Sequence, residues 1–123
     1  MRDSAKKTSV LVVEDEIIVG LDVAMTLEDY GFVVQGPFKT SDAALESIKD
    51  QKPDFAVLDL NLGGDKTSEA VAQKLTELNC PFYFLTGYGA SSHPVIEKYS
   101  SVKCLTKPID PRRVAKMIDV AMA

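Results

Sequence analysis

The chain contains few of the residues that form crosslinks or hold transition metals. Its 123 residues include no tryptophan, one histidine and two cysteines. This content does not suggest a disulfide framework or a site built from several cysteines and histidines. Cys80 and Cys104 each stand beside apolar residues. We therefore interpret them as two separate buried thiols in a protein of a reducing cytoplasm.

Long apolar runs and an excess of basic charge are also missing. No apolar stretch approaches the ~20 residues that a membrane-spanning helix needs, and the N-terminal apolar segment is too short for a secretory signal. A net charge of -4 argues against binding to nucleic acid or to an anionic membrane surface. The length fits one domain. We expect this domain at residues 8–123, after a flexible polar tail at residues 1–7.

Five short apolar segments recur along the chain and alternate with helical patterns. Several are nearly continuous in β-branched or aromatic residues, as in parallel strands that are covered on both faces. The order predicts an α/β protein with a doubly wound (βα)5, flavodoxin-like fold and a parallel sheet in strand order 2-1-3-4-5. The expected strands are SVLVV (9–13), FVVQG (32–36), FAVLD (55–59), FYFLT (82–86) and VKCLT (102–106).

Four of the five intervening segments have clear helical patterns. Three of them open on a serine or threonine cap or carry a proline in the first turn: TSDAALESIKD, TSEAVAQKLTEL and PRRVAKMIDVAMA. The weak segment is YGASSHPVIEKYS, the fourth in chain order. It contains glycine, serines and Pro94, so we expect about two mobile turns there. The first segment, EIIVGLDVAMTLEDY, has one apolar stripe formed by Ile17, Ile18, Leu21, Ala24 and Met25.

Polar residues stand at the carboxyl ends of the predicted strands, where ligands bind in this class of fold. Strands 1 and 3 would be neighbours, so acids that follow both strands should converge with groups from strands 4 and 5. The residues at these ends are Glu14, Asp15 and Glu16 after strand 1, Asp59 and Asn61 at strand 3, Thr86 at strand 4, and Lys107 at strand 5.

Each of these residues also has a simpler interpretation. The acids after strand 1 could cap a helix, Asp59 could begin a turn, and Lys107 could be a solvated charge. Taken together, these interpretations leave the convergence of mutually repelling carboxylates unexplained. A hard cation such as Mg²⁺ accounts for it. A carboxylate there could attack a phosphoryl group, while Lys107 and Thr86 stabilise the phosphoryl charge. No Walker-type loop is present, so the phosphoryl group would arrive on a phosphoprotein or a small phosphodonor.

These motifs, in this order and spacing, resemble the receiver domain of two-component response regulators. The resemblance runs from VLVVEDE through AVLDLNL and FLTGY to LTKP. It implies that Asp59 is the phospho-acceptor and that Lys107 contacts the phosphoryl group. It implies that Thr86 is the switch hydroxyl and that the bond from Lys107 to Pro108 is cis.

The resemblance also implies a set of Mg²⁺ ligands. Asp15 and Asp59 would bind the ion directly, Glu14 would act mainly through water, and the backbone carbonyl of Asn61 would complete the set.

A narrower resemblance links the chain to the FATGUY receivers of alphaproteobacteria. PFYFLTGY is similar to their Pro-Phe-x-Phe-Ala-Thr-Gly-Tyr signature, although Leu85 replaces the alanine. These receivers commonly pair with histidine kinases of the HWE or a related type. Cys104 stands in the place of an aromatic switch residue, which FATGUY receivers also lack. Tyr88 would influence access to the phosphoryl group.

A pair of glycines and the single histidine also need an interpretation. Gly63 and Gly64 replace a proline that receivers usually have, so we expect a looser loop there. We interpret His93, the only histidine, as a solvated loop residue rather than a relay base.

The sequence therefore predicts a single-domain response regulator, not an enzyme beyond promoting its own Mg²⁺-dependent phosphorylation and dephosphorylation. A histidine kinase, a phosphotransfer protein or acetyl phosphate would phosphorylate Asp59. Since the chain ends with its last helix, we expect output through protein binding or a role as a phosphate sink. One alternative is a pseudo-receiver that only binds partners. Another is a flavin carrier, but the sequence has EDE where that class needs a phosphate-binding loop.

Overall fold

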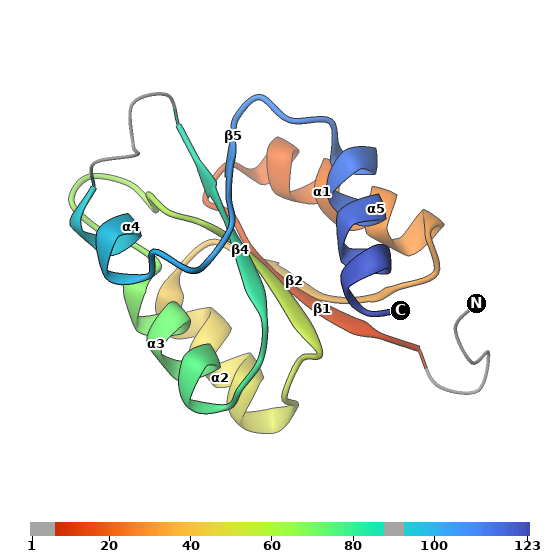
Figure 1. The fold of residues 1–123 in the computed structure, drawn as a ribbon, viewed down its shortest axis with the longest axis horizontal. Coiled ribbons are helices and arrows are strands. Elements are labelled where there is room, and N and C mark those ends of the chain that lie inside the picture. The colour runs from red at the N-terminus through yellow and green to blue at the C-terminus, as the bar shows by residue number, and fades with distance from the viewer. Residues whose placement is uncertain (1–6, 88–92) are drawn as a thin grey trace.

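The computed structural model describes residues 7–87 and 93–123, and they form five parallel strands in one sheet (Figure 1). The strand order is β2-β1-β3-β4-β5, so the predicted fold class is confirmed. No helix among the described residues is long and apolar enough to cross a membrane. The elements are β1 (Ser9–Val13), α1 (Ile17–Asp29), β2 (Val33–Phe38), α2 (Ser41–Asp50), β3 (Phe55–Asp59), α3 (Glu69–Glu77), β4 (Phe82–Thr86), α4 (Pro94–Lys98), β5 (Cys104–Thr106) and α5 (Pro111–Ala121).

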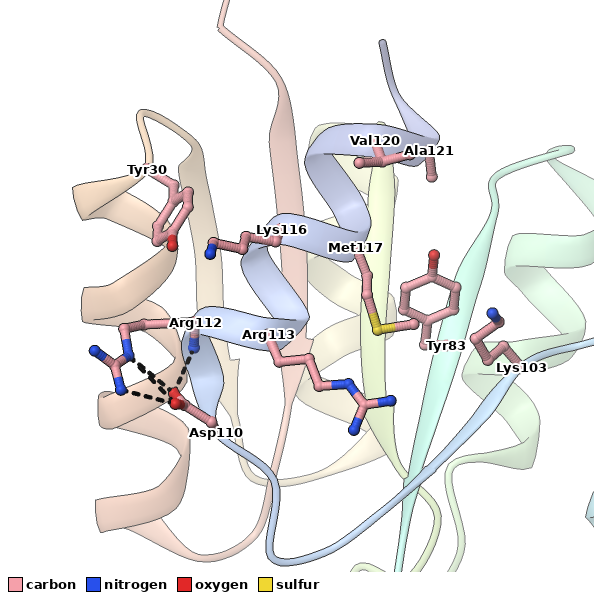
Figure 2. A pocket seen from close by; sticks show the side chains of 10 residues that line it. All are labelled: Tyr30, Tyr83, Lys103, Asp110, Arg112, Arg113, Lys116, Met117, Val120 and Ala121. Carbon is pink, nitrogen blue, oxygen red and sulfur yellow. Dashed lines mark hydrogen bonds and ion pairs between the residues drawn. The ribbon is translucent and has the colours of Figure 1, made fainter.

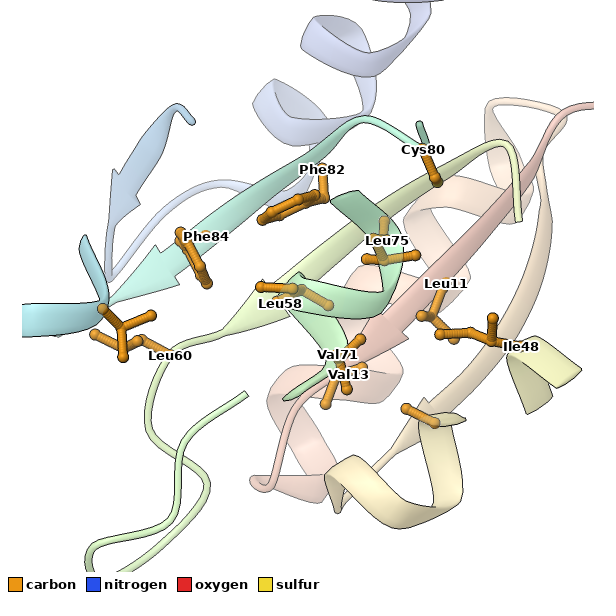
Figure 3. Packing of buried hydrophobic residues seen from close by; sticks show 14 residues of the cluster. Leu11, Val13, Ile48, Leu58, Leu60, Val71, Leu75, Cys80, Phe82 and Phe84 are labelled. Carbon is orange, nitrogen blue, oxygen red and sulfur yellow. The ribbon is translucent and has the colours of Figure 1, made fainter. Parts of the chain in front are cut away.

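The sheet separates two apolar cores. Figure 1 shows α1 and α5 on one side of the sheet and α2, α3 and α4 on the other. Successive residues of β1 enter different cores: Leu11 and Val13 pack under α2 and α3 (Figure 3), whereas Val10 and Val12 pack under α1 and α5. Every residue of β1 and β3 is buried. This burial on both faces explains why the central strands are apolar at nearly every position.

The apolar stripe predicted for α1 does not face the core. Of its five residues only Ala24 is buried, and Ile18 is 82% exposed. The residues that contact the sheet belong to a neighbouring stripe, and Gly20 lies within it. A Cβ at Gly20 would come within 3.0 Å of the Pro37 side chain, so this glycine lets α1 approach β2 closely. The buried residues are Gly20, Val23, Ala24 and Leu27. A helix that is apolar on most sides has no single stripe that identifies its buried face.

The helix α4 has five residues, a little over one turn, which is shorter than predicted. His93 is not a solvated loop residue, because its Nδ1 accepts a hydrogen bond from the backbone N–H of Val95 at 3.1 Å and caps the helix. Tyr99 follows the helix and packs edge-on against Phe84, with 6.1 Å between ring centroids. The other part of the segment predicted to be mobile, residues 88–92, lies outside the described residues, as do residues 1–6 of the predicted tail.

Truncation of a core residue should be costly, whereas truncation of the exposed α1 stripe should not. We expect Leu58→Ala, at a site with no exposed surface, to lower the free energy of unfolding by about 2–5 kcal/mol. The control Ile18→Ala should change it by less than about 0.5 kcal/mol. Urea denaturation followed by circular dichroism measures both values. A large loss for Ile18→Ala would show that the stripe is buried after all.

Candidate functional site

Three carboxylates meet where β1 and β3 end, as the sequence predicted. The two strands are neighbours, with Val13 paired to Leu58, so the residues after β1 lie beside the end of β3. One carboxylate oxygen each from Glu14, Asp15 and Asp59 lies within 4.8 Å of the others. Glu14 is 2% and Asp59 4% exposed. Two of the three acids are therefore held almost out of water.

The acids after β1 point mainly into this cluster rather than cap α1. The backbone N–H of Glu14 donates to the carbonyl of Phe38 at 2.9 Å, which fixes the chain beside β2. The Glu14 carboxylate accepts one bond from the backbone N–H of Glu16 at 3.1 Å. The N-cap residue Glu16 makes no side-chain cap, and the first turn of α1 contains no acid. Helix capping therefore does not account for these acids.

Lys107 extends from the end of β5 into the carboxylate cluster. Its Nζ lies 2.8 Å from Glu14 Oε1, 3.0 Å from Asp59 Oδ2 and 3.7 Å from Glu16 Oε1. Its backbone N–H donates to the carbonyl of Thr86 at 2.8 Å, which places it at the rim of the sheet. The bond from Lys107 to Pro108 is cis. The solvated-charge interpretation of Lys107 is therefore wrong.

Burial and repulsion make Asp59 an unusual acid. Burial, a side-chain hydrogen bond with Glu14 and the charge of Glu14 raise the pKa of Asp59 to about 8, although Lys107 opposes the shift. Burial alone would lower the pKa of Lys107, but its bonds to Glu14 and Asp59 raise that pKa above its ordinary value. One lysine thus balances the charge of several carboxylates only in part.

The donor set fits a hard divalent cation. Three carboxylates that can each offer an oxygen to one point are the kind of ligand that Mg²⁺ takes. A second positive charge beside Lys107 would favour the ionised form of all three acids. The described part of the chain offers no other group of three or more metal-ligating acids, histidines or cysteines at this spacing.

Thr86 and Asn61 stand at the same rim. Asp59 is paired with Leu85, and the backbone N–H of Leu60 donates to the Leu85 carbonyl at 2.9 Å. Thr86 is the next residue along β4 and is 5% exposed. Asn61 forms an isolated antiparallel bridge with Thr67. Its carbonyl as a metal ligand stays a prediction.

The loop after β3 is tied more firmly than the sequence suggested. Leu62 donates its N–H to the carbonyl of Lys66 at 2.9 Å, and Lys66 donates back to the carbonyl of Gly63 at 3.0 Å. Gly63 and Gly64 have φ values of 103° and 59°. Glycine adopts such values without steric cost, so the pair forms a tight turn in place of the usual proline. The GGD sequence is a turn signal that could have predicted this.

Cys104 is a packing residue and not part of the acidic cluster. It is half-buried on β5, against the apolar core that includes Val95, Ile96 and Tyr99 of the α4 region. Burial raises the pKa of its thiol, which keeps it protonated and unreactive. Both cysteines are free, as predicted. Tyr88, predicted to influence access to the site, lies outside the described residues.

The sequence did not reveal the aromatic contact beside this site. Tyr99 packs on Phe84, two residues before Thr86, and also on Phe82 at 6.2 Å between centroids. Tyr99 follows α4, whereas both phenylalanines belong to β4, and no local pattern links it to them.

Replacement of the ionisable Asp59 carboxyl should stabilise the metal-free protein. The native carboxyl keeps its proton up to about pH 8, whereas the unfolded one loses it near 3.8. The free energy of unfolding without Mg²⁺ should therefore fall as the pH rises from about 4 to about 8. Asp59→Asn should remove most of this slope and add about 1–3 kcal/mol at neutral pH. Urea denaturation in a chelator at several pH values measures both effects.

The exposed carboxylate Asp65 provides the control for this experiment. Asp65→Asn should leave the wild-type slope unchanged. An equal slope in wild type and Asp59→Asn would show that Asp59 is ionised normally in the native state.

Comparison with known proteins identifies the family. The model of the response regulator receiver domain matches residues 10–119. The transcriptional regulatory protein PdtaR of Mycobacterium tuberculosis is 24% identical over 120 residues, which cover 94% of this chain and 56% of PdtaR. The phyllosphere-induced regulator PhyR of Methylorubrum extorquens is 26% identical over 117 residues, 94% of this chain and 43% of PhyR. The chain thus spans about half the length of these relatives.

Solved structures agree with this result. SdrG from Sphingomonas melonis is 30% identical, with a TM-score of 0.79, and the match covers 99% of this chain and 100% of SdrG. The signal receiver domain of a modulated diguanylate cyclase from Desulfovibrio desulfuricans is 26% identical, with a TM-score of 0.80 and coverage of 95% and 94%. On the family match, the fold and the acidic rim together, the chain belongs to the receiver domains of two-component response regulators.

Proposed function

We propose that this receiver domain accepts a phosphoryl group on Asp59. The observation that carries the proposal is the position of this carboxylate, which is 4% exposed and lies 3.0 Å from the Lys107 ammonium within a cluster of acids. Buried acids repel one another, so the cluster costs stability unless it binds a cation. A site that binds a cation for phosphoryl transfer would explain why the domain tolerates this loss of stability.

In the proposed reaction, a carboxylate oxygen of Asp59 attacks the phosphorus atom of the donor. The new O–P bond forms an acyl phosphate, while the bond from phosphorus to the leaving group breaks. The leaving group is a histidine ring nitrogen in a phosphohistidine donor and acetate in acetyl phosphate. Lys107, already within hydrogen-bond distance of Asp59, stabilises negative charge on the transferring oxygens. Bound Mg²⁺ would supply further charge neutralisation on these oxygens.

The ion would be held by the residues that the resemblance implies. Asp15 and Asp59 would contribute carboxylate oxygens, Asn61 its backbone carbonyl, and Glu14 would act through water. Asp15 is half-buried, which supports its role as a direct ligand that an entering ion can reach.

Thr86 would transmit the state of Asp59 to the rest of the domain. The phosphorylated Asp59 attracts the Thr86 hydroxyl inward and shifts the population between two packings of residues 93–99. The contact of Phe84 with Tyr99 supports this route, because it joins the strand that ends in Thr86 to the residue that ends α4. Tyr88 would control access to the phosphoryl group.

We further propose a FATGUY-type, single-domain regulator whose receiver domain comprises residues 8–123. The 30% identity to SdrG over 99% of this chain supports the likeness to that protein. The partner would be a histidine kinase, of the HWE type, or a phosphotransfer protein, and output would occur through protein binding or as a phosphate sink. The pseudo-receiver is the weaker candidate, since each of the acidic, hydroxyl and lysine positions is filled.

Phosphorylation can be tested directly. With Mg²⁺ and acetyl phosphate, intact-protein mass spectrometry should show the mass of one added phosphoryl group, because Asp59 is the acceptor. Asp59→Asn should show none, and the control Asp65→Asn, at an exposed carboxylate of the next loop, should be modified like wild type. Chelation of the metal should slow the reaction by at least about tenfold. Unmodified wild-type protein would favour the pseudo-receiver.

Thr86→Ala should allow phosphorylation of Asp59 but abolish the structural change that follows it. The variant keeps Asp59 and Lys107, so it should still acquire a phosphoryl group. Hydrogen exchange of the backbone amides at residues 93–99 should change on phosphorylation in wild type but not in the variant, because the hydroxyl that couples them is gone. Unchanged exchange in phosphorylated wild type would contradict the proposed switch.

A further inference from the structure

Glu16 is an acid of the rim that neither caps α1 nor belongs to the three clustered carboxylates. It occupies the N-cap position, but its side chain makes no cap hydrogen bond. Its backbone is held in place, because its N–H donates to Glu14 Oε2 at 3.1 Å. The side chain is 65% exposed, and its Oε1 lies 3.7 Å from Lys107 Nζ. That distance is too long for a hydrogen bond, so Glu16 acts on the ammonium through its charge.

The three acids around Lys107 show from which side a phosphodonor can reach it. Glu14 and Asp59, at 2.8 and 3.0 Å from Nζ, are almost fully buried. Glu16 is the exposed member of the three. The solvent side of the ammonium is therefore the side on which Glu16 lies. A phosphoryl group that approaches Asp59 and Lys107 from solvent must pass close to the Glu16 carboxylate.

No second cation offsets the charge of Glu16 in the described part of the chain. Lys107 is the only basic side chain there within ion-pair distance of Glu16. Other basic side chains surround a hollow beside α5 (Figure 2): Lys103, Arg112, Arg113 and Lys116. With a divalent ion bound, the three clustered carboxylates would be balanced by that ion together with Lys107. Glu16 would then remain as one unbalanced negative charge at the mouth of the site.

We propose that Glu16 is a specificity-determining residue that selects phosphodonors by their charge. The proposal rests on phosphoryl acceptance by Asp59. A small dianionic donor such as acetyl phosphate meets the unbalanced carboxylate and is repelled, which slows its reaction without preventing it. A phosphohistidine on a protein surface that carries a lysine or arginine beside it is repelled less. Glu16 therefore favours a protein donor of this kind over free acyl phosphates.

Two small donors allow the effect of charge to be measured. Acetyl phosphate is a dianion at neutral pH, whereas phosphoramidate has a protonated nitrogen and is a monoanion. In both reactions an oxygen of Asp59 forms the new O–P bond of the acyl phosphate. The bond that breaks is O–P in acetyl phosphate, which releases acetate, and N–P in phosphoramidate, which releases ammonia. Neither reaction needs a further reactant, so the two rates can be compared directly.

The test is the ratio of the two second-order rates, acetyl phosphate over phosphoramidate, for the full chain at neutral pH and saturating Mg²⁺. Intact-protein mass spectrometry measures both rates. Glu16→Gln should raise the ratio about threefold, the effect of one unit of donor charge about 6 Å from the carboxylate in a water-like medium. A change in Mg²⁺ affinity, in the folded fraction or in the pKa of Asp59 affects both rates alike and cancels in the ratio.

Two control variants and added salt test whether the effect comes from the charge of Glu16. Glu16→Asp keeps the charge and should keep the wild-type ratio. Glu28→Gln removes an equal charge at an exposed site near the other end of α1 and should also keep it. Since salt screens exposed charges, the difference between wild type and Glu16→Gln should shrink at about 1 M salt.

The outcomes separate this inference from the proposed function. If the wild type is phosphorylated and Glu16→Gln has the same ratio, selection by Glu16 is wrong and Asp59 is still the acceptor. An equal rise of the ratio in Glu28→Gln would also overturn the inference, because it would show that only the net charge of the chain matters. A wild type that accepts no phosphoryl group from either donor would overturn the proposed function and this inference with it.

Discussion

The ammonium of Lys107 is the charge on which the rim of this domain depends. It lies within 3.0 Å of both Glu14 and Asp59, two carboxylates that are almost fully buried. Buried like charges would otherwise drive these acids to bind protons. Because one ammonium balances them only in part, the pKa of Asp59 remains raised. The same excess of negative charge that destabilises the folded state makes the cluster a suitable site for a divalent cation.

Sheet topology provides the second constraint. The order β2-β1-β3-β4-β5 makes β1 and β3 neighbours, and it places the ends of β4 and β5 beside them. Four segments that are distant in the sequence thereby contribute to one rim. The backbone bond from Lys107 to the carbonyl of Thr86 shows how strand pairing positions a side chain that acts on a different strand. A local change at any one strand end would thus affect the charge balance of the whole cluster.

The helices are where sequence reasoning was least successful. The stripe of Ile17, Ile18, Leu21, Ala24 and Met25 is regular, yet the sheet contacts a stripe centred on Val23 and Leu27. Periodicity shows that a helix forms, but it does not show which apolar side packs against the sheet. The other apolar side stays exposed. The capping of α4 by His93 and the packing of Tyr99 on Phe84 likewise depend on three-dimensional neighbours.

The sequence alone determined the strands, their order and the residues that gather at the rim, because buried parallel strands and strand-end acids leave clear local patterns. Only the tertiary structure decided the ion pairs of Lys107, the raised pKa of Asp59, the firm turn at Gly63 and Gly64, and the exposed face of α1. The physical reason is the same in each case. Distances between side chains, and access to water, depend on residues that are far apart in the chain.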